Sequence, residues 1–237
     1  AAETGEPVWS AGEGKFSYCS TQLSRVAGVD QLLICTDAGL AAYEPEKGTV
    51  LWKYDWPLEG GMARVVQPAV VAGTDVLIGT GFGNGTRRVH VTRDGDKWSV
   101  EQVWWTKAFK PYFNDLVVHR NHVFGFDGNF FVCVNLDDGK IKWKARGYGN
   151  GEVLLLPDQN LLLVVTEATG ELVLLDATPD RHVELFKISA LSGKTWNHPV
   201  VAHGKLFLRN GEEAVCYEIG EPDASSADSE ESSPPSD

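Results

Sequence analysis

Five polar residues recur at near-regular spacing along the chain, and their side chains are the first candidates for chemistry. Each precedes a short apolar run, and successive members lie 45, 47, 38 and 45 residues apart. They are Gln22, Gln67, Asn114, Glu152 and Asn197, with His198 beside the last as a sixth candidate. Amide oxygens bind neutral polar ligands, whereas a bare divalent cation prefers several carboxylates. Because only Glu152 is charged among the five recurring residues, the set predicts a site for a small polar ligand and no bound metal.

The same residues have a second interpretation, which the sequence leaves open. Polar side chains at strand starts also cap backbone groups and contact water in a channel. No other pattern predicts catalysis, since the histidines lack HxH or HExxH spacing and no GxSxG motif occurs. The four cysteines form no CxxC pair and are interpreted as small buried side chains. We therefore predict no catalytic residue.

A short phrase that ends in tryptophan recurs three times and indicates how these side chains are positioned. It places Trp four residues after Gly at Gly5–Trp9, Gly48–Trp52 and Gly139–Trp143. Glycine takes the left-handed backbone of a tight turn, and an alternating strand begins directly after it. Trp104 takes the same role in a degenerate copy. We interpret these tryptophans as structural, packing between repeats and donating their ring N–H to backbone carbonyls.

A period in the forties with four short strands predicts the blades of a β-propeller. The expected blades span residues 20–56, 65–106, 112–146, 151–189 and 195–219, with almost no helix. In each blade the recurring polar residue precedes the innermost strand, so the five residues should surround one mouth of the axial channel. The last blade has only three strands. Either Pro7–Ser10 supplies the fourth and closes the ring, or the chain is part of a larger ring of seven or eight blades.

Composition and charge set further limits on the function. The net charge of −12 is acidic, and six of the 33 acids lie in residues 221–237, which contain Ser, Pro and acid and no base. We expect residues 1–220 to form the propeller and 221–237 to be disordered. An acidic surface argues against nucleic acid as a partner. No apolar run approaches transmembrane length, and these residues contain no signal peptide.

The Trp phrase resembles the repeat of the PQQ-like, or quinoprotein-like, family. The repeat of that family has the form A/LD-x-x-TG-x-x-x-W. In this chain, Glu44 and Asn135 stand where the family usually has Asp. Residues 193–210 resemble the last blade of bacterial extracytoplasmic members, which implies a periplasmic or secreted location. The resemblance implies either a non-catalytic, BamB-like scaffold for protein partners or a PQQ-dependent alcohol-type dehydrogenase with PQQ and Ca²⁺. Many alcohol-oxidising members have adjacent cysteines and this chain has none, which favours the scaffold without a cofactor.

Overall fold

The computed structural model describes residues 1–56, 58, 66–81 and 83–219, and its regular elements are all β-strands. No helix in this part of the chain is long and apolar enough to cross a membrane. The acidic segment that we expected to be disordered, residues 221–237, lies outside the described residues.

Within these described ranges, nineteen strands form five antiparallel sheets in chain order. The first sheet contains β1 (Gln22–Val26), β2 (Val29–Thr36), β3 (Gly39–Tyr43) and β4 (Val50–Asp55). The second contains β5 (Ala69–Val71), β6 (Asp75–Thr80), β7 (Gly85–Asp94) and β8 (Lys97–Thr106). The third contains β9 (Val117–His119), β10 (His122–Asp127), β11 (Phe130–Asn135) and β12 (Ile141–Arg146). The fourth contains β13 (Glu152–Leu156), β14 (Leu161–Val165), β15 (Glu171–Asp176) and β16 (Glu184–Ser189), and the fifth contains β17 (Val200–Ala202), β18 (Lys205–Arg209) and β19 (Ala214–Glu218).

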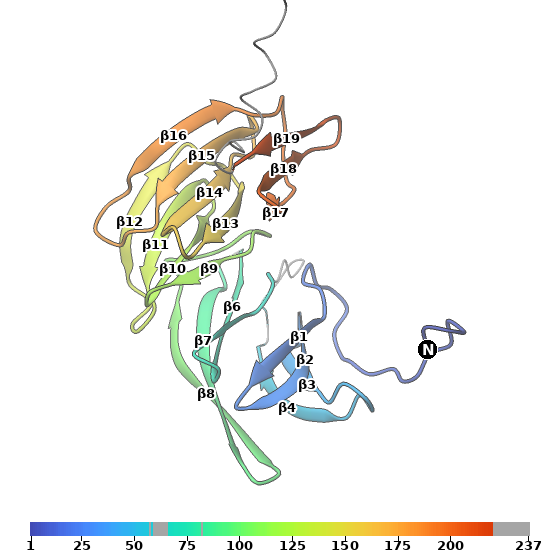
Figure 1. The fold of residues 1–237 in the computed structure, drawn as a ribbon. Helices are drawn as coiled ribbons and strands as arrows, with labels where there is room; N and C mark the ends of the chain where they lie inside the picture. The colour runs from blue at the N-terminus through green and yellow to red at the C-terminus, as the bar shows by residue number, and fades with distance from the viewer. Residues whose placement is uncertain (57, 59–65, 82, 220–237) are drawn as a thin grey trace, which may run out of the picture.

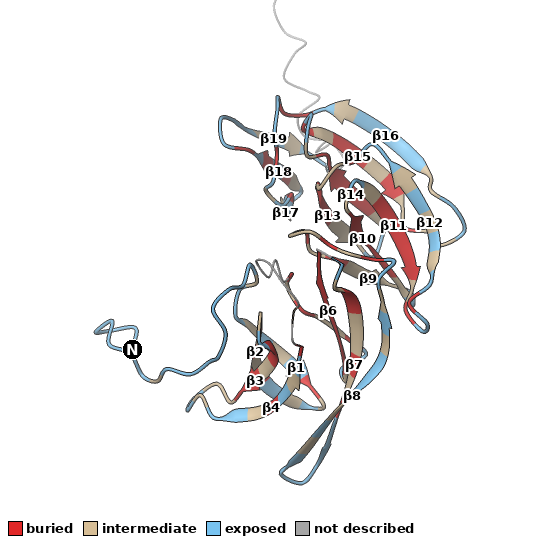
Figure 2. Ribbon diagram, turned by 180° about the vertical axis from the view of Figure 1, so that it is seen from behind, coloured by how far each residue is buried: buried red, intermediate tan, exposed pale blue. Residues whose placement is uncertain are grey.

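The sheets follow one another along an arc, with the first and the fifth at its ends (Figure 1). The first strands of successive sheets lie next to one another, β1 beside β5, β5 beside β9 and β9 beside β13. Buried residues concentrate in the middle strands, while β8, β12 and β16 are exposed along much of their length (Figure 2). The prediction of four-stranded antiparallel propeller blades is confirmed.

Apolar alternation on the strands produces the core between neighbouring sheets. Between the third and fourth sheets, for example, Phe124 and Phe131 pack with Leu162 and Val173, and all four side chains are fully buried. Successive strand residues point to opposite faces, so a middle strand contributes to the contacts on both sides of its sheet. The core is therefore a series of apolar layers between sheets.

Tight turns with a positive-φ glycine precede β4 and β12. The φ angles are +67° at Gly48 and +68° at Gly139, and each glycine N–H donates to the carbonyl four residues earlier. A β-bulge then follows at the same place in both sheets, beside the pairs Ala42–Trp52 and Cys133–Trp143. The ring N–H of Trp143 donates to the Thr178 carbonyl of the next sheet over 2.9 Å, as the structural interpretation predicts.

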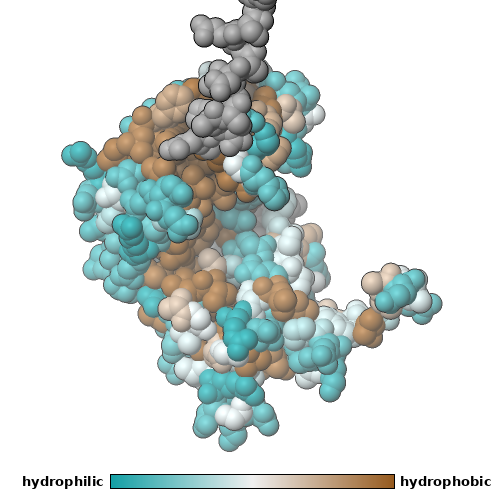
Figure 3. All heavy atoms as spheres, in the orientation of Figure 1, coloured by the Kyte–Doolittle hydropathy of each residue, from teal (hydrophilic) through white to brown (hydrophobic). Residues whose placement is uncertain are grey.

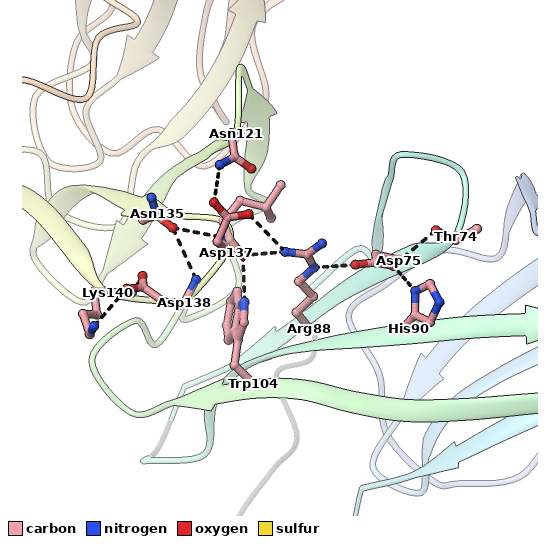
Figure 4. A network of polar contacts seen from close by, with 11 residues as sticks. Thr74, Asp75, Arg88, His90, Trp104, Asn121, Asn135, Asp137, Asp138 and Lys140 are labelled. Carbon is pink, nitrogen blue, oxygen red and sulfur yellow. Dashed lines mark hydrogen bonds and ion pairs between the residues drawn. The ribbon is translucent and has the colours of Figure 1, made fainter.

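The contact between the second and third sheets includes Trp104 and a network of charged side chains (Figure 4). The indole N–H of Trp104 and the guanidinium of Arg88 both donate to the Leu136 carbonyl, over 2.7 Å and 2.9 Å. Arg88 also pairs with Asp75, whose side chain is only 5% exposed. Burial alone would raise the pKa of Asp75, but hydrogen bonds from His90 and Arg88 outweigh it and lower that pKa. The ion pair lies within the second sheet and orients Arg88, whose contact with the Leu136 carbonyl joins the two sheets.

The predicted closing role of Pro7–Ser10 does not appear in the structure. Within the described residues β19 has no fourth strand beside it, and residues 7–10 are not in a strand. Instead the Trp9 indole donates to the Pro45 carbonyl over 3.0 Å, at the turn that precedes β4. The segment therefore packs against the first sheet.

Candidate functional site

The recurring polar residues occupy equivalent places at the inner strands. Gln22 and Glu152 are the first residues of β1 and β13. Gln67, Asn114 and Asn197 lie two or three residues before β5, β9 and β17. They therefore stand at the same end of the inner strand in all five sheets, as the period predicts.

A pocket of about 770 Å³ opens at this end, and we call it the mouth site. All five sheets or the segments that lead into them contribute to it. Its lining residues are Tyr18, Ser20, Gln67, Tyr112, Phe113, Asp115, Asn150, Glu152, Glu167, Lys194, Trp196 and His198.

Three of the six sequence candidates line the mouth site: Gln67, Glu152 and His198. Gln22 lies behind them and accepts a hydrogen bond from the Gln67 side-chain amide. Asn114 is fully buried, and its amide donates to the Gly151 carbonyl, so the backbone-capping interpretation holds for this residue. Asn197 is half-buried and does not line the pocket. The structure therefore does not place the side chains of Asn114 and Asn197 on the lining of this pocket.

Gln67 ties the first three sheets together at the mouth. Its side-chain oxygen accepts from Ser20 N over 2.9 Å, and its amide donates to the Ser20 carbonyl over 3.0 Å. Its backbone N–H donates to Asp115 Oδ1 over 3.0 Å. The amide is thus fully occupied by the protein, and its role is to fix the rim of the pocket.

An acidic group forms the floor. His198 Nε2 lies 3.2 Å from Glu152 Oε2 and 3.5 Å from Asp115 Oδ2. The Glu152 side chain is only 3% exposed, and its Oε2 makes no contact with hydrogen-bond geometry among the described residues. Burial, together with the nearby Asp115 charge, raises the pKa of Glu152 to about 9. Glu152 is therefore a neutral carboxylic acid at pH 7 and has a proton to donate.

An aromatic wall stands opposite, built on Trp196 and Phe113. Their rings meet edge to face with centroids 5.3 Å apart. The Trp196 indole donates to Glu167 Oε1 over 2.8 Å, and Asn150 donates twice to Glu167 Oε2. Burial opposes ionisation of Glu167, but these hydrogen bonds outweigh it and lower its pKa. The ammonium of Lys194 lies 3.5 Å from the centroid of the Trp196 ring, a cation–π contact.

The sequence candidates did not include several residues that line the pocket, namely Tyr112, Phe113, Asn150, Glu167 and Lys194. Three of these could have been found, because Phe113 and Tyr112 directly precede Asn114, and Asn150 precedes Glu152 by two residues. Glu167 follows β14 and reaches the pocket from a turn in the fourth sheet, for which the repeated phrases hold no signal.

The comparisons with known proteins agree with this architecture. A family profile described as outer membrane protein assembly factor BamB matches residues 1–145 and, in an overlapping alignment, residues 36–233. No functionally curated protein matches the chain.

Two solved structures resemble it at low sequence identity. One is a protein of unknown function from Desulfotomaculum acetoxidans, with a TM-score of 0.60, 12% identity, and 84% of this chain and 68% of that chain covered. The other is BamB from Moraxella catarrhalis, with a TM-score of 0.40, 13% identity, and 78% and 66% covered. The chain thus spans about two thirds of the length of the structures it matches. Because the family profile covers most of the chain and its repeats form propeller blades, the chain belongs to the BamB family of PQQ-like repeat propellers.

Proposed function

We propose that the protein is a non-catalytic, extracytoplasmic scaffold that binds a partner protein at the mouth site. The observation that carries the proposal is that side chains from all five sheets, or from the segments that lead into them, line one pocket. Its volume lies within the usual range for ligand sites, roughly 300–1,000 Å³. The extracytoplasmic location is supported by the family, whose description names outer membrane assembly.

The lining favours a polar polypeptide segment with hydrogen-bond donors or a basic group. Trp196 and Phe113 offer flat apolar surfaces, while Asp115 and Glu167 offer acceptor oxygens. The indole of Trp196 is 48% exposed although its N–H is already bonded to Glu167. A partner therefore meets an aromatic surface held in a fixed orientation, which lowers the ordering cost of binding.

The alternative, a PQQ-dependent dehydrogenase, fits these residues poorly. A Ca²⁺ ion needs several ionised or carbonyl oxygens around one point. Among the described residues no group of three or more His, Cys, Asp and Glu side chains has that arrangement. A neutral Glu152 is a weak cation ligand, and Lys194 covers one face of the Trp196 ring on which a flat cofactor would stack. We therefore propose that the site takes neither PQQ nor Ca²⁺.

Site-specific photocrosslinking in a bacterial periplasm tests the scaffold function. A benzoylphenylalanine is placed at Phe113 or Trp196 in the mouth site, and at Trp98 on the distant hairpin between β7 and β8 as the control. We expect one discrete protein adduct from the mouth positions, lost when Asp115→Asn and Glu167→Gln are combined with the probe. Equal adducts at Trp98, or none at either mouth position, would contradict the proposal.

Calorimetry with Ca²⁺ and quinone absorbance after adding PQQ test the alternative. We expect no binding of either and no change of melting temperature on chelation. Micromolar Ca²⁺ binding that Glu152→Gln abolishes would support the dehydrogenase instead.

A further inference from the structure

Lys194 lines the mouth site and contacts its aromatic wall. Among the described residues that line the pocket, it is the only lysine or arginine. The residue is exposed, and its ammonium lies 3.5 Å from the centroid of the Trp196 ring. No carboxylate in the described part of the chain lies within ion-pair distance of this ammonium. The ring face is therefore the contact that holds the cation in place.

The nearby carboxylate of Glu167 is already occupied. Its Oε1 accepts the indole N–H of Trp196, and its Oε2 accepts two hydrogen bonds from Asn150. Burial raises the pKa of Glu167, but these hydrogen bonds, with the charge of Lys194, outweigh burial and lower it. Glu167 and Phe113 thus fix the Trp196 ring, whereas Lys194 can leave that ring without breaking an ion pair of the described residues.

The rest of the pocket also attracts positive charge. Tyr18, Tyr112 and Phe113 line it, and the faces of aromatic rings attract cations. Asp115, which precedes β9, and Glu167, which follows β14, add carboxylates from the third and fourth sheets. A guanidinium matches such a lining, because it is planar, stacks on aromatic faces and has five N–H donors.

We propose that Lys194 is an internal ligand, which occupies a cation subsite on the Trp196 ring until an arginine side chain of the partner displaces it. The cation subsite is the face of the Trp196 ring that the Lys194 ammonium covers. The inference rests on the proposed function, since it names the group by which the mouth site recognises the partner segment.

An internal ligand makes the mouth site selective. A partner segment must move Lys194 into the solvent, and an exposed cation–π contact of this kind corresponds to about a two- to fivefold change in affinity. An arginine replaces the lost contact with its own and adds N–H donors toward the carboxylates of the lining. A segment without a cation loses the contact and replaces nothing, so Lys194 disfavours neutral and acidic segments.

Nuclear magnetic resonance titration with an acetylated and amidated Gly-Arg-Gly peptide tests the proposal. The neutral control is Gly-citrulline-Gly, which has nearly the same shape and no charge. We expect saturable shifts of the Trp196 indole N–H signal, assigned by its loss in Trp196→Phe. The citrulline peptide should bind more weakly by about fivefold or more. The methylene protons next to the Lys194 ammonium, shielded by the ring in the free protein, should move to the position of an exposed lysine at saturation.

Substitution of Lys194 gives an effect of unusual sign. Lys194→Ser removes the internal ligand and should strengthen binding of the arginine peptide by about two- to fivefold. Lys194→Arg keeps a cation on the ring, so its affinity should equal or fall below that of the native protein. Lys97→Ser is the matched control, because it removes the same charge from the exposed start of β8. Circular dichroism confirms that each variant is folded.

Three results would overturn the proposal. The first is equal binding of the arginine and citrulline peptides, or no binding of either to the native protein and to Lys194→Ser. The second is the same change of affinity in Lys194→Ser and Lys97→Ser, which would show only a long-range effect of net charge. The third is a Lys194 methylene signal that keeps its ring shielding when the peptide saturates the site.

The photocrosslinking experiment separates this inference from the proposed function. If discrete adducts form at the mouth positions while the arginine peptide does not bind, the cation subsite is overturned and the scaffold function stands. If the peptide binds as expected while no adduct forms, the cation subsite is supported and the scaffold function is contradicted.

Discussion

Glu152 combines near-complete burial with a carboxyl group, and its ionisation is therefore linked to stability. Its pKa is raised to about 9 by burial and by Asp115, whereas a glutamate in an unfolded chain titrates near 4.3. Between these values the folded protein retains a proton that the unfolded chain has lost. Stability should consequently fall as pH rises through this window, by at most about 1.4 kcal/mol per pH unit.

Urea unfolding at pH 5.5, 7 and 8.5 measures this dependence. Glu152→Gln keeps the shape and remains neutral, so its stability should decline less with pH than that of the native protein. The neighbours Asp115 and His198 are unchanged in this variant, and Glu101→Gln on the exposed part of β8 is the control. If the free energy of unfolding changed with pH in the same way for all three proteins, Glu152 would not titrate as described.

Trp52 tests the structural interpretation of the repeated tryptophans. Its ring is 4% exposed, and its N–H donates to the Gln31 side chain over 2.6 Å. Trp52→Ala should destabilise the protein by about 3–5 kcal/mol in chemical unfolding. Trp105→Ala, whose ring is 45% exposed, should cost much less, and equal losses would contradict the assignment.

The sequence predicts the mouth site only in part, for a physical reason. A period in the forties marks positions that every blade must fill in the same way, and so it finds Gln67 and Glu152. The aromatic wall lies in segments that differ from blade to blade, so no repetition marks Phe113 or Lys194. His198 was found because it adjoins a recurring position, although Asn197, the recurring residue itself, does not line the pocket.

At the scale of the elements, the glycine turns at Gly48 and Gly139 each pack against a tryptophan ring from outside their own sheet. Gly139 has a φ of +68°, and a Cβ there would lie 2.9 Å from the Trp104 ring. Gly95 has a φ of +58° with no atom within 4 Å of such a Cβ. Gly139→Ala should therefore cost more stability than Gly95→Ala, which carries only the backbone strain of about 1–2 kcal/mol. If the two variants lost the same stability in thermal unfolding, the Trp104 ring would have to move aside at no cost.

Strand positions were predictable because turn glycines and alternating apolar residues mark them locally. The expected blade over residues 112–146, for instance, contains a sheet that runs from Val117 to Arg146. Phe186 was not anticipated, since it replaces Trp in the fourth sheet and lacks the glycine spacing. Only the register beside the bulge identifies it.

At the scale of the molecule, each sheet depends on its neighbours in the manner of a repeat array. The central strands β10, β11 and β14 are almost wholly buried, while β17 and β19 contain only exposed and half-buried residues. Hydrogen exchange should therefore be slowest in the third and fourth sheets and fastest in the fifth. Uniform protection along the chain would contradict this order.

The fifth sheet and the sheet before it also enclose an apolar groove of about 610 Å³, which Phe186 and Tyr217 line. Apolar side chains gather over this part of the molecule in the space-filling view (Figure 3).

The period of the sequence repeat predicted five units and their order. It could not establish whether the ends meet, because closure depends on the angle between sheets, which no single repeat encodes.

The serial order of the sheets also determines how the protein responds to a pulling force. A tension applied between Trp9 and Glu218 passes through the sheets in series, because each sheet is connected to the next by one covalent segment and by apolar packing between them. Elements in series share the same tension, so the least stable gives way first while the others remain intact. The three-stranded fifth sheet should detach before the rest, and stretching of single molecules should lengthen the protein in steps of one sheet each.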